Sequence, residues 1–351
     1  MERVDGGSAP GTPGTTESRR ARLRRWPRAG GLLRWGAEAT GRSPWARGRV
    51  LAALAVVTAA LLAFHSAVPN RVGRLGSLLE TFLPWLGLAV PLLLVLALLR
   101  RSAVALVALL WPAAVWGFLF GGRVVAGDRG AHDITAVQHN VSDVNTDPAG
   151  TARALSESGP DLIALEELTP AARPAYAREL AARYPHRAVR GTVGLWSKYP
   201  LADVRAVDIR PQGVGTDWNR GLRASARTPW GEVAVYVAHL PSVRVQARGL
   251  TSGRRDESAG LLGAELAAEK RQKVILLGDL NGTVDDRGLD PVTARLDSVG
   301  REFSAFSWPT AFPVARIDHV MTRAATVTHV RTLPATTSDH LPLAADITFT
   351  P

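Results

Sequence analysis

The chain has 351 residues and a net charge of +11, and it contains no cysteine. Disulfide-stapled small domains and thiolate metal sites are therefore excluded as classes. The length suffices for one large domain or two ordinary domains, with cores formed by apolar side chains alone.

The first segment, residues 1–49, is basic and poor in apolar side chains. It carries eleven arginines against four acidic residues, and glycine and proline are frequent from Gly7 to Gly14. This composition predicts a disordered basic tail. A tail that binds nucleic acid is the alternative interpretation.

Three apolar runs follow the tail, at 50–68, 78–99 and 103–120. Each is long enough to cross the hydrocarbon layer of a membrane as a helix. Residues 86–99 include no polar side chain, whereas the helices of a soluble bundle show a polar face. We therefore predict three transmembrane helices within residues 50–122. A cleaved signal peptide in the first run is the alternative, although the basic region before it is far longer than such a peptide carries.

Arginines near the ends of these runs predict the orientation in the membrane. The basic tail favours the cytoplasmic side, as do Arg100 and Arg101 between the second and third runs. Arg71 and Arg74 in the first outer loop oppose this orientation without outweighing the tail. Three crossings then predict that residues 123–351 lie outside the cell membrane.

From residue 133 onward, the sequence indicates short strands separated by turns. Valines recur at every second position from Val233 to Val237, and in the segment 273–277 a lysine and four apolar residues precede a glycine. Both patterns are typical of strands. Further strands are predicted at 133–141, 161–166, 315–321 and 344–349, and helices at 151–158, 170–182 and 258–270. This mixture predicts a layered α/β or α+β domain at 133–351, joined to the last apolar run by a linker at 123–132.

Polar side chains stand at the ends of the predicted strands. They are Asn140, Glu167, His239, Asp279, Asn281, Asp318, Asp339 and His340. Asp279 and Asn281 are two residues apart, so on an extended chain they point the same way and can share one ligand. Carboxylate and amide oxygens favour Mg²⁺, with Mn²⁺ as the alternative, and the absence of cysteine disfavours a zinc cage. A divalent cation, a histidine that donates to an oxygen and an aspartate that orients water together indicate phosphate-ester hydrolysis.

Each pattern also has a purely structural interpretation. Residues 278–281 are typical of a turn that ends a strand, 338–340 of a local cap, and His239 of a histidine satisfied at a strand end. Arg220 and Arg223 are candidates to bind a substrate phosphate, and they are equally typical of a solvated strand edge. The order and context of the motifs favour a site over these separate explanations.

The ordered motifs resemble the signatures of the endonuclease/exonuclease/phosphatase superfamily. They are Asp-Leu-Ile-Ala-Leu-Glu-Glu at 161–167, His-Leu at 239–240, Gly-Asp-Leu-Asn at 278–281, Arg-Ile-Asp at 316–318 and Ser-Asp-His at 338–340, and Asn140 looks like the first-strand asparagine. The resemblance extends from residue 133 to residue 350. It implies a four-layer α/β/β/α sandwich, in which two sheets lie face to face with helices outside and the site lies at one edge of the sheets.

The resemblance implies a Mg²⁺ centre and an attacking water. Glu167 is similar to the principal metal ligand, Asn140 to a residue close to metal and phosphate, and Asp339 to a residue that supports the metal. Asp279 resembles the residue that positions or deprotonates the water. Asn281 resembles the one that holds the phosphate.

The resemblance also implies a pair of histidines on the scissile phosphate. His239 and His340 resemble the residues that bind this phosphate and stabilise the transition state, and Asp318 resembles the residue that orients a histidine. Two positions depart from the family pattern. Glu166 stands where glutamine is common and His319 where an aromatic residue is common, so their roles stay open.

Attachment to a membrane narrows the range of expected substrates. About ten residues separate the last apolar run from the first predicted strand, and even fully extended they reach roughly 40 Å. The site is therefore expected near the bilayer surface. A nearly neutral domain held there suits a phosphorylated lipid headgroup better than DNA, so nucleic acid is not the expected partner.

This arrangement is similar to the teicoplanin-resistance membrane proteins of the VanJ type, which implies a part in antibiotic resistance. We hypothesise a membrane-anchored, Mg²⁺-dependent phosphohydrolase that acts on a lipid-linked phosphate or pyrophosphate, such as undecaprenyl pyrophosphate, at the outer face. One alternative is an extracellular, membrane-tethered nuclease or phosphodiesterase. The other is an inactive membrane adaptor, against which the intact acidic and histidine motifs argue.

Overall fold

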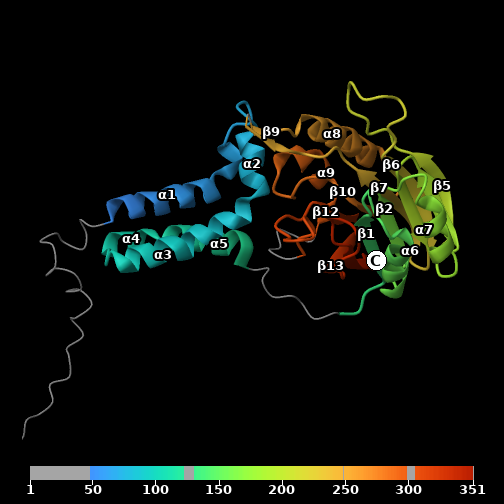
Figure 1. The fold of residues 1–351 in the computed structure, drawn as a ribbon, viewed down its shortest axis with the longest axis horizontal. Coiled ribbons are helices and arrows are strands. Elements are labelled where there is room, and N and C mark those ends of the chain that lie inside the picture. Colours follow the sequence, from blue (N-terminus) through green and yellow to red (C-terminus); the bar gives the residue numbers. More distant parts are fainter. Residues whose placement is uncertain (1–47, 122–129, 248, 299–304, 351) are drawn as a thin grey trace, which may run out of the picture.

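The chain has two parts, which the computed structural model describes over residues 48–121, 130–247, 249–298 and 305–350. Almost all of the predicted tail at 1–49 and most of the predicted linker at 123–132 lie outside the described residues. Figure 1 shows that helices α1 to α5 project from one side of a sandwich of strands and helices.

The apolar runs form the helical part. Its elements are α1 (Arg49–Ala63), η2 (His65–Ala67), α2 (Leu75–Thr81), η3 (Leu83–Leu88), α3 (Ala89–Leu99), α4 (Ala103–Ala108) and α5 (Leu110–Phe120). The chain runs toward the sandwich in α1, away from it in η3 and α3, and back in α4 and α5 (Figure 1). Ala55, Ala97 and Ala105 are buried where these passes meet, and their small side chains allow a close approach.

By length and hydropathy, the last of the three predicted transmembrane helices qualifies as a span by itself. Ala103–Phe120 has 18 residues and a mean hydropathy of 2.1. Leu75–Thr81 and Leu83–Leu99 qualify only as a pair, bent by 70° at their junction, and α1 has only 15 residues. The described residues thus hold one such helix, or two if the bent pair counts as one span. The prediction of three transmembrane helices is not confirmed.

Local sequence explains why the first two runs do not form long straight helices. In the first run the helix ends at Ala63, where polar His65 leads into a short 3₁₀ turn before Pro69. In the second run Pro84 stands at the start of η3. Proline has no N–H to donate to a preceding turn, so a helix that enters from α2 cannot continue through it.

The rest of the described chain forms two six-stranded sheets. The first has the order β13-β14-β1-β2-β4-β3 and the second the order β11-β12-β10-β7-β6-β5. The first contains β1 (Ile134–Asn140), β2 (Leu162–Glu166), β3 (His186–Arg190), β4 (Val193–Ser197), β13 (Ala325–Thr332) and β14 (Leu343–Phe349). The second contains β5 (Leu201–Ala206), β6 (Gly221–Thr228), β7 (Gly231–His239), β10 (Val274–Asp279), β11 (Asp297–Ser298) and β12 (Asp318–Arg323). A short hairpin adds β8 (Val245–Gln246) and β9 (Gly249–Leu250).

Helices cover the outer faces of both sheets. They are α6 (Pro148–Glu157) and α7 (Arg173–Leu180) on the first sheet, and α8 (Gly253–Ala268), η5 (Arg287–Leu289) and α9 (Asp290–Thr293) on the second. One apolar cluster lies between the sheets, where Val235 and Ile347 belong to it. Two others join each sheet to its helices, through Leu155 on α6 and Leu262 on α8. The prediction of an α+β fold, a four-layer α/β/β/α sandwich, is confirmed.

Strand pairing brings the predicted site residues to one edge of the sandwich. β1 and β2 run parallel, and so do β7 and β10. Asp279 pairs with His239 on one side and with Asp318, on the antiparallel β12, on the other. Because the carboxyl ends of parallel strands meet at the same edge of a sheet, Asp279 and His239 come together there.

The helical part contacts the sandwich at this same edge. Glu80 on α2 is 1% exposed and accepts hydrogen bonds from Arg287, from the backbone N–H at 3.1 Å, Nε at 2.8 Å and Nη2 at 2.6 Å. Trp85 Nε1 donates to the carbonyl oxygen of Val314 at 2.8 Å, and its ring stacks on Phe306 with centroids 5.5 Å apart. Arg287 follows β10 and Val314 precedes β12, so the loops that flank the predicted site lie against the helical part.

Candidate active site

Asp279, the last residue of β10, forms the centre of a buried polar group. Its Oδ2 accepts a hydrogen bond from Asn140 Nδ2 at 3.0 Å, and its Oδ1 accepts one from the backbone N–H of Asn281 at 2.9 Å. The side chain of Asn281 donates a third, from Nδ2 to Oδ2, at 3.2 Å. Burial raises the pKa of Asp279 to about 7. The positive charge of His340 acts in the opposite direction, and the negative charge of Asp318 raises the pKa further. Three donors thus fix a carboxyl group that can exchange a proton near neutral pH.

His340 and Asp318 form a buried ion pair beside Asp279. His340 Nδ1 lies 2.8 Å from Asp318 Oδ2, and Asp318 Oδ1 accepts a hydrogen bond from Gln138 Nε2 at 2.9 Å. Burial disfavours the imidazolium, but the carboxylates of Asp318 and Asp279 outweigh it and raise the pKa of His340 to about 10. Burial likewise opposes ionisation of Asp318, yet its partner His340 lowers the pKa of this carboxyl. His340 is therefore a fixed cation at neutral pH.

His239, the last residue of β7, stands between a guanidinium and two carboxylates. Arg220 Nη1 lies 3.2 Å from its Nδ1 and 3.4 Å from its Nε2. Its Nε2 is 3.7 Å from Asp279 Oδ2 and also 3.7 Å from Glu167 Oε1. Burial, Arg220 and His340 hold the pKa of His239 well below its ordinary value. The ring is therefore neutral and can donate one N–H.

Glu166 and Glu167 are neighbours with different environments, which settles the first departure from the family pattern. Glu166 is fully buried, and its Oε2 accepts a hydrogen bond from Gln138 Nε2 at 2.8 Å. Burial and the carboxylates of Asp318 and Asp279 raise the pKa of Glu166 well above its ordinary value, which favours the neutral form of this carboxyl group. Glu167 adopts a φ of 56°, and its side chain is 26% exposed. Of the two, Glu167 is the carboxylate that remains accessible at the edge of the site.

His319, the second departure, supports a loop. The ring is buried, and its Nε2 donates to the carbonyl oxygen of Gly282 at 2.7 Å. Burial and the nearby Arg316 lower the pKa of His319 to about 4, so the ring is neutral. It holds the turn that follows Asn281.

Sequence reasoning missed two further residues that position the group. Gln138 bridges Glu166 and Asp318, and its place two residues before Asn140 on the same strand face is a signal that could have found it. Arg255 is fully buried and donates to the carbonyl oxygen of Asn281 at 3.2 Å. It lies in a run of four charged residues, a pattern that gives no sign of burial.

One predicted site residue, Arg223, does not join the group, and another, Asp339, lies at its exposed margin, where its charge acts on His340. Arg223 is buried on β6, where Nε donates to Glu269 Oε2 at 2.9 Å and Nη1 to Ser225 Oγ at 2.6 Å. Side chains three positions apart on a strand point to opposite faces, so Arg223 cannot follow Arg220 toward the site. The prediction that Arg223 binds substrate is corrected to a structural ion pair. The side chain of Asp339 is exposed, and its role at the metal stays a prediction.

The donor atoms of the group fit a divalent cation. One ligand atom each from Asp279, Asp318 and His340 lie within 4.8 Å of one another, and of these only the two carboxyl groups have lone pairs to offer a cation, because His340 is protonated. Such a set, rich in carboxylates and without thiolates, is the kind that hard divalent cations bind. Glu167 and Asn140 border the same group through His239 and Asp279, and they add a carboxylate and an amide.

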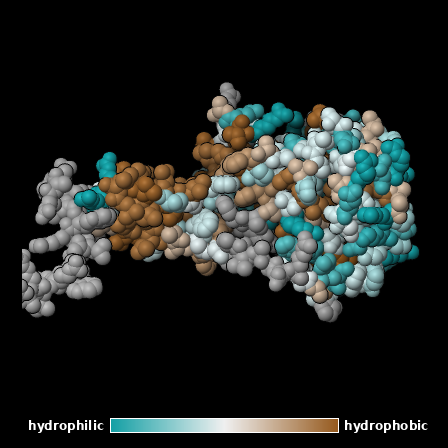
Figure 2. Space-filling view, turned by 60° about the horizontal axis from the view of Figure 1, so that its bottom comes forward, coloured by the Kyte–Doolittle hydropathy of each residue, from teal (hydrophilic) through white to brown (hydrophobic). Residues whose placement is uncertain are grey.

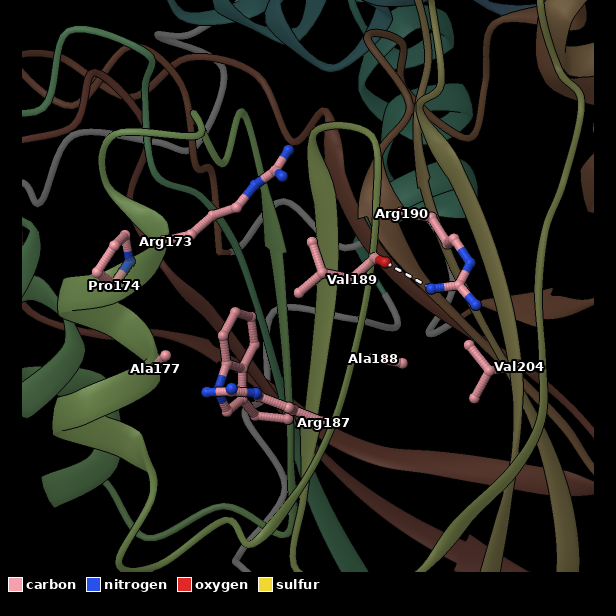
Figure 3. A pocket seen from close by; sticks show the side chains of 9 residues that line it. Arg173, Pro174, Ala177, Arg187, Ala188, Val189, Arg190 and Val204 are labelled. Atoms are coloured by element: carbon pink, nitrogen blue, oxygen red, sulfur yellow. Dashed lines mark hydrogen bonds between the residues drawn. The ribbon is translucent and has the colours of Figure 1, made fainter.

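The cavity in Figure 3 is separate from these residues. It has a volume of about 550 Å³ and lies between α7 and the strands β3 and β4, where Arg173, Arg187 and Arg190 line it. Arg173 donates to the carbonyl oxygen of Gly191, and Arg190 to that of Val189 at 2.9 Å. None of the described residues that line it carries a carboxylate or an imidazole, so it lacks the groups of the polar edge.

Comparisons with known proteins agree with this geometry. A family model described as Endonuclease/Exonuclease/phosphatase family matches residues 119–340. A search of curated proteins finds no match to the chain.

Two solved structures are similar to the sandwich. D. rerio TDP2 complexed with single strand DNA product has 19% sequence identity and a TM-score of 0.51, over 61% of this chain and 98% of that one. An endonuclease/exonuclease/phosphatase from Beutenbergia cavernae DSM 12333 has 18% identity and a TM-score of 0.50, over 63% of this chain and 72% of that one. At these identities the likeness shows the fold.

Proposed function

Because the chain belongs to the endonuclease/exonuclease/phosphatase family, we propose that this phosphoesterase-like hydrolase is anchored in a membrane and cleaves a lipid-linked phosphate or pyrophosphate. The observation that carries the proposal is the contact between the polar edge of the sandwich and the apolar helices. Hydrogen bonds from Arg287 to Glu80 and from Trp85 to Val314 hold the loops next to Asp279 and Asp318 against the helical part. A site in this place is close to a substrate that is embedded in the bilayer.

The exposed surface of the helices supports insertion in a membrane. Figure 2 shows a continuous hydrophobic surface over the helices, next to the mixed surface of the sandwich. Leu99, Trp111 and Phe118 are 76%, 67% and 88% exposed, and 28% of Ala103–Phe120 is buried. In water an apolar surface of this extent drives association, whereas acyl chains solvate it.

The arginines at one end of the helices support an outward-facing sandwich. Gly48 lies against Ser102, so Arg49, Arg100 and Arg101 stand together at the end away from the sandwich (Figure 1). Arginine near a membrane end favours the cytoplasm, which assigns the other end to the outer face. A helix as short as α1 is about 22 Å long, below the roughly 30 Å of a hydrocarbon core, so the proposal requires local thinning of the bilayer.

Asp279 is the residue that we assign to the attacking water. Hydrogen bonds from Asn140 and Asn281 fix its carboxylate, and a pKa of about 7 suits a group that accepts a proton at neutral pH. Its Oδ2 lies 3.8 Å from His340 Nε2 and 3.7 Å from His239 Nε2. These gaps exceed hydrogen-bond lengths, so an oxygen of water or phosphate can bridge them.

His340, Arg220 and His239 are assigned to the phosphate. The His340 imidazolium, held by Asp318, and the Arg220 guanidinium can offset negative charge that develops on the phosphoryl oxygens. Neutral His239 donates an N–H. A bound divalent cation, Mg²⁺ or Mn²⁺, would be held by Glu167 and Asn140, with Asp339 in support, and would neutralise phosphate charge and polarise a phosphoryl oxygen.

A substrate panel tests the proposed function. Full-length protein in lipid nanodiscs is incubated with a polyprenyl diphosphate, the matching monophosphate or single-stranded DNA, with Mg²⁺ or with EDTA. We expect phosphate release from a polyprenyl phosphate with Mg²⁺ only, and a loss of about a hundredfold or more in the Asp279→Asn variant. Cleavage of DNA alone would favour a nuclease, and inactivity of well-folded protein on every substrate would favour an adaptor.

A further inference from the structure

A second cavity begins where the strand that carries His239 ends. It has a volume of about 730 Å³, and Trp218, Arg220, Pro241, Arg244, Thr251 and Arg254 are among the residues that line it. Pro241 follows His239 by two residues, and the hydrogen bond from Asn281 Nδ2 to the carbonyl oxygen of Leu240, at 3.0 Å, fixes the turn between them. The cavity therefore borders the candidate active site, and Arg220 beside His239 is part of its lining.

Two arginines of this cavity are available to bind an anion. The side chains of Arg244 and Arg254 are exposed, and within the described part of the chain neither guanidinium has an ion pair or a hydrogen bond. The acidic residues of the neighbouring helix are already engaged, since Asp256 pairs with Arg255 at 2.8 Å and Glu257 Oε1 accepts from a backbone N–H at 3.0 Å. No described acidic residue lines the cavity. Its wall is thus positively charged without compensation.

Arg220 belongs both to this cavity and to the catalytic group. Its guanidinium lies 5.1 Å from the centre of the Trp218 ring, and its Nη1 is 3.2 Å from His239 Nδ1. Stacking on the indole holds the guanidinium at the boundary between the two spaces. A substrate with one anionic group at His239 can therefore extend past Arg220 and place a second anionic group beside Arg244 and Arg254.

The opposite side of the cavity is tied to the helical part. The N–H of Leu250, on the β8–β9 hairpin, donates to the carbonyl oxygen of Gly73 at 2.9 Å, and Arg74 forms an ion pair with the first turn of α8. The same two segments carry exposed apolar side chains, Val72 and Val245. The cavity thus lies between the catalytic group and the turn that joins the first helices, on which Val72 is exposed.

The arginine-lined cavity of Figure 3 makes a useful contrast. There Arg173 and Arg190 donate to backbone carbonyl oxygens, and none of the described catalytic candidates borders the space. The presence of arginine in a cavity wall is therefore not enough to identify a binding site for the substrate. The second cavity differs because Arg244 and Arg254 have no acidic partner among the described residues and because Arg220, in its lining, lies beside His239.

We propose that this second cavity binds the lipid-linked phosphoryl group of a lipid diphosphate whose terminal phosphoryl group lies at His239 and Asp279. The inference rests on the proposed function and narrows its substrate to the diphosphate. The oxygen of water bonds to the terminal phosphorus, the bridging P–O bond breaks, and its electron pair stays with the lipid monophosphate. The water proton leaves through Asp279. Arg244 and Arg254 bind the phosphate that becomes the leaving group.

A binding experiment tests the cavity without catalysis. Full-length protein in nanodiscs is titrated by calorimetry with methylenediphosphonate or with inorganic phosphate, at fixed free Mg²⁺. We expect the Arg244→Ala/Arg254→Ala variant to bind the diphosphonate about tenfold more weakly and inorganic phosphate unchanged, because two charge-assisted contacts are lost. The matched control is Arg178→Ala, which removes an exposed arginine on α7. The Arg244→Lys/Arg254→Lys variant retains both charges and should keep most of the affinity.

Kinetics separate this inference from the proposed function. In the alanine double variant, KM for a polyprenyl diphosphate should rise about tenfold, while KM and kcat for bis(4-nitrophenyl) phosphate stay within twofold. If wild-type protein does not hydrolyse the lipid diphosphate, the proposed function fails, and the calorimetry still decides the cavity. Equal diphosphonate affinity in wild type and double variant would overturn the inference. A selective loss of single-stranded DNA cleavage in the double variant would overturn it too, in favour of a polynucleotide.

Discussion

The polar edge of the sandwich and the helical part place their polar and apolar groups in opposite ways. At the edge, charged groups such as Asp318 and His340 are buried and bonded to one another. In the helical part, apolar side chains such as Leu99 and Phe118 are exposed. Burial of charge tunes acids and bases, whereas exposure of apolar surface suits acyl chains. This difference between the two parts is what the proposed anchoring of the helical part in a membrane requires.

The contact between the two parts combines both features. Glu80 is a buried carboxylate, yet it belongs to the helical part, and its partner Arg287 belongs to the sandwich. Arg255 connects this contact to the active-site turn. Its guanidinium donates to Asp286, the neighbour of Arg287, at 2.5 Å and to the carbonyl oxygen of Asn281 at 3.2 Å. A short path of ionic and hydrogen-bonded residues thus links the helices to the active-site turn.

The largest effect on activity is expected at Glu167, and its neighbour Glu166 at the polar edge serves as the comparison. Glu167→Gln removes the accessible carboxylate, and we expect hydrolysis to fall by about a hundredfold or more. Glu166→Gln replaces a buried acid, whose neutral form burial favours, by an amide of the same shape, and activity should stay within a fewfold. Initial rates with Mg²⁺ measure both, with thermal unfolding as the check on folding. Equal losses in the two variants would contradict the assignment of Glu167.

The next effect tests whether the helical part positions the site. Glu80→Gln weakens the contact with Arg287, and we expect about tenfold slower hydrolysis of a lipid substrate in nanodiscs with an unchanged rate on bis(4-nitrophenyl) phosphate. The matched control is Glu265→Gln, because Glu265 pairs with Arg205 on the surface at 2.7 Å and such pairs contribute little. A parallel loss on both substrates would show that Glu80 acts on the catalytic group itself.

Local patterns predicted the parts of the site that lie close together in the chain. Asp279 and Asn281 were expected to share a ligand because of their two-residue spacing, and Asn281 bonds to Asp279 through its backbone and its side chain. The pair of His340 with Asp318 joins two distant segments, and only the family resemblance indicated it. Arg223 was misjudged because its partner Glu269, at the end of α8, is also distant in sequence.

The same limit applies to the fold. Strands with a clear alternation or a closed apolar run, such as β7 and β10, were predicted close to their observed bounds. β5 was missed because it is an edge strand with little buried surface, which leaves no period in its sequence. In the helical part, hydropathy predicted uninterrupted runs and gave too little weight to Pro84, where the second run bends.

A pH series sharpens the comparison by testing whether buried charge stabilises the polar edge. The pKa of His340 is raised from 6.5 to about 10, so its contribution is complete below pH 6.5 and is lost as the pH rises toward 10. The pKa of Asp318 is lowered from 3.8, so its contribution is present above pH 3.8 and is lost on further acidification. In EDTA, the difference in melting temperature between wild type and His340→Gln should be largest between these limits and shrink toward pH 10. A difference that does not vary with pH would contradict the ion pair.

The smallest effect on catalysis is expected for Arg223→Gln, because Arg223 lies outside the catalytic group. Arg223 and Arg220 lie three residues apart, but Arg223 bonds to Glu269 whereas Arg220 lies beside His239. We expect Arg223→Gln to leave kcat and KM within twofold and to lower the melting temperature, because it breaks a buried ion pair. Arg220→Gln should instead raise KM or lower kcat with little change in stability, since the guanidinium faces the substrate space. If Arg223→Gln impaired catalysis as much as Arg220→Gln in folded protein, both arginines would have to act on the substrate, and the division between a structural and a substrate-binding arginine would fail.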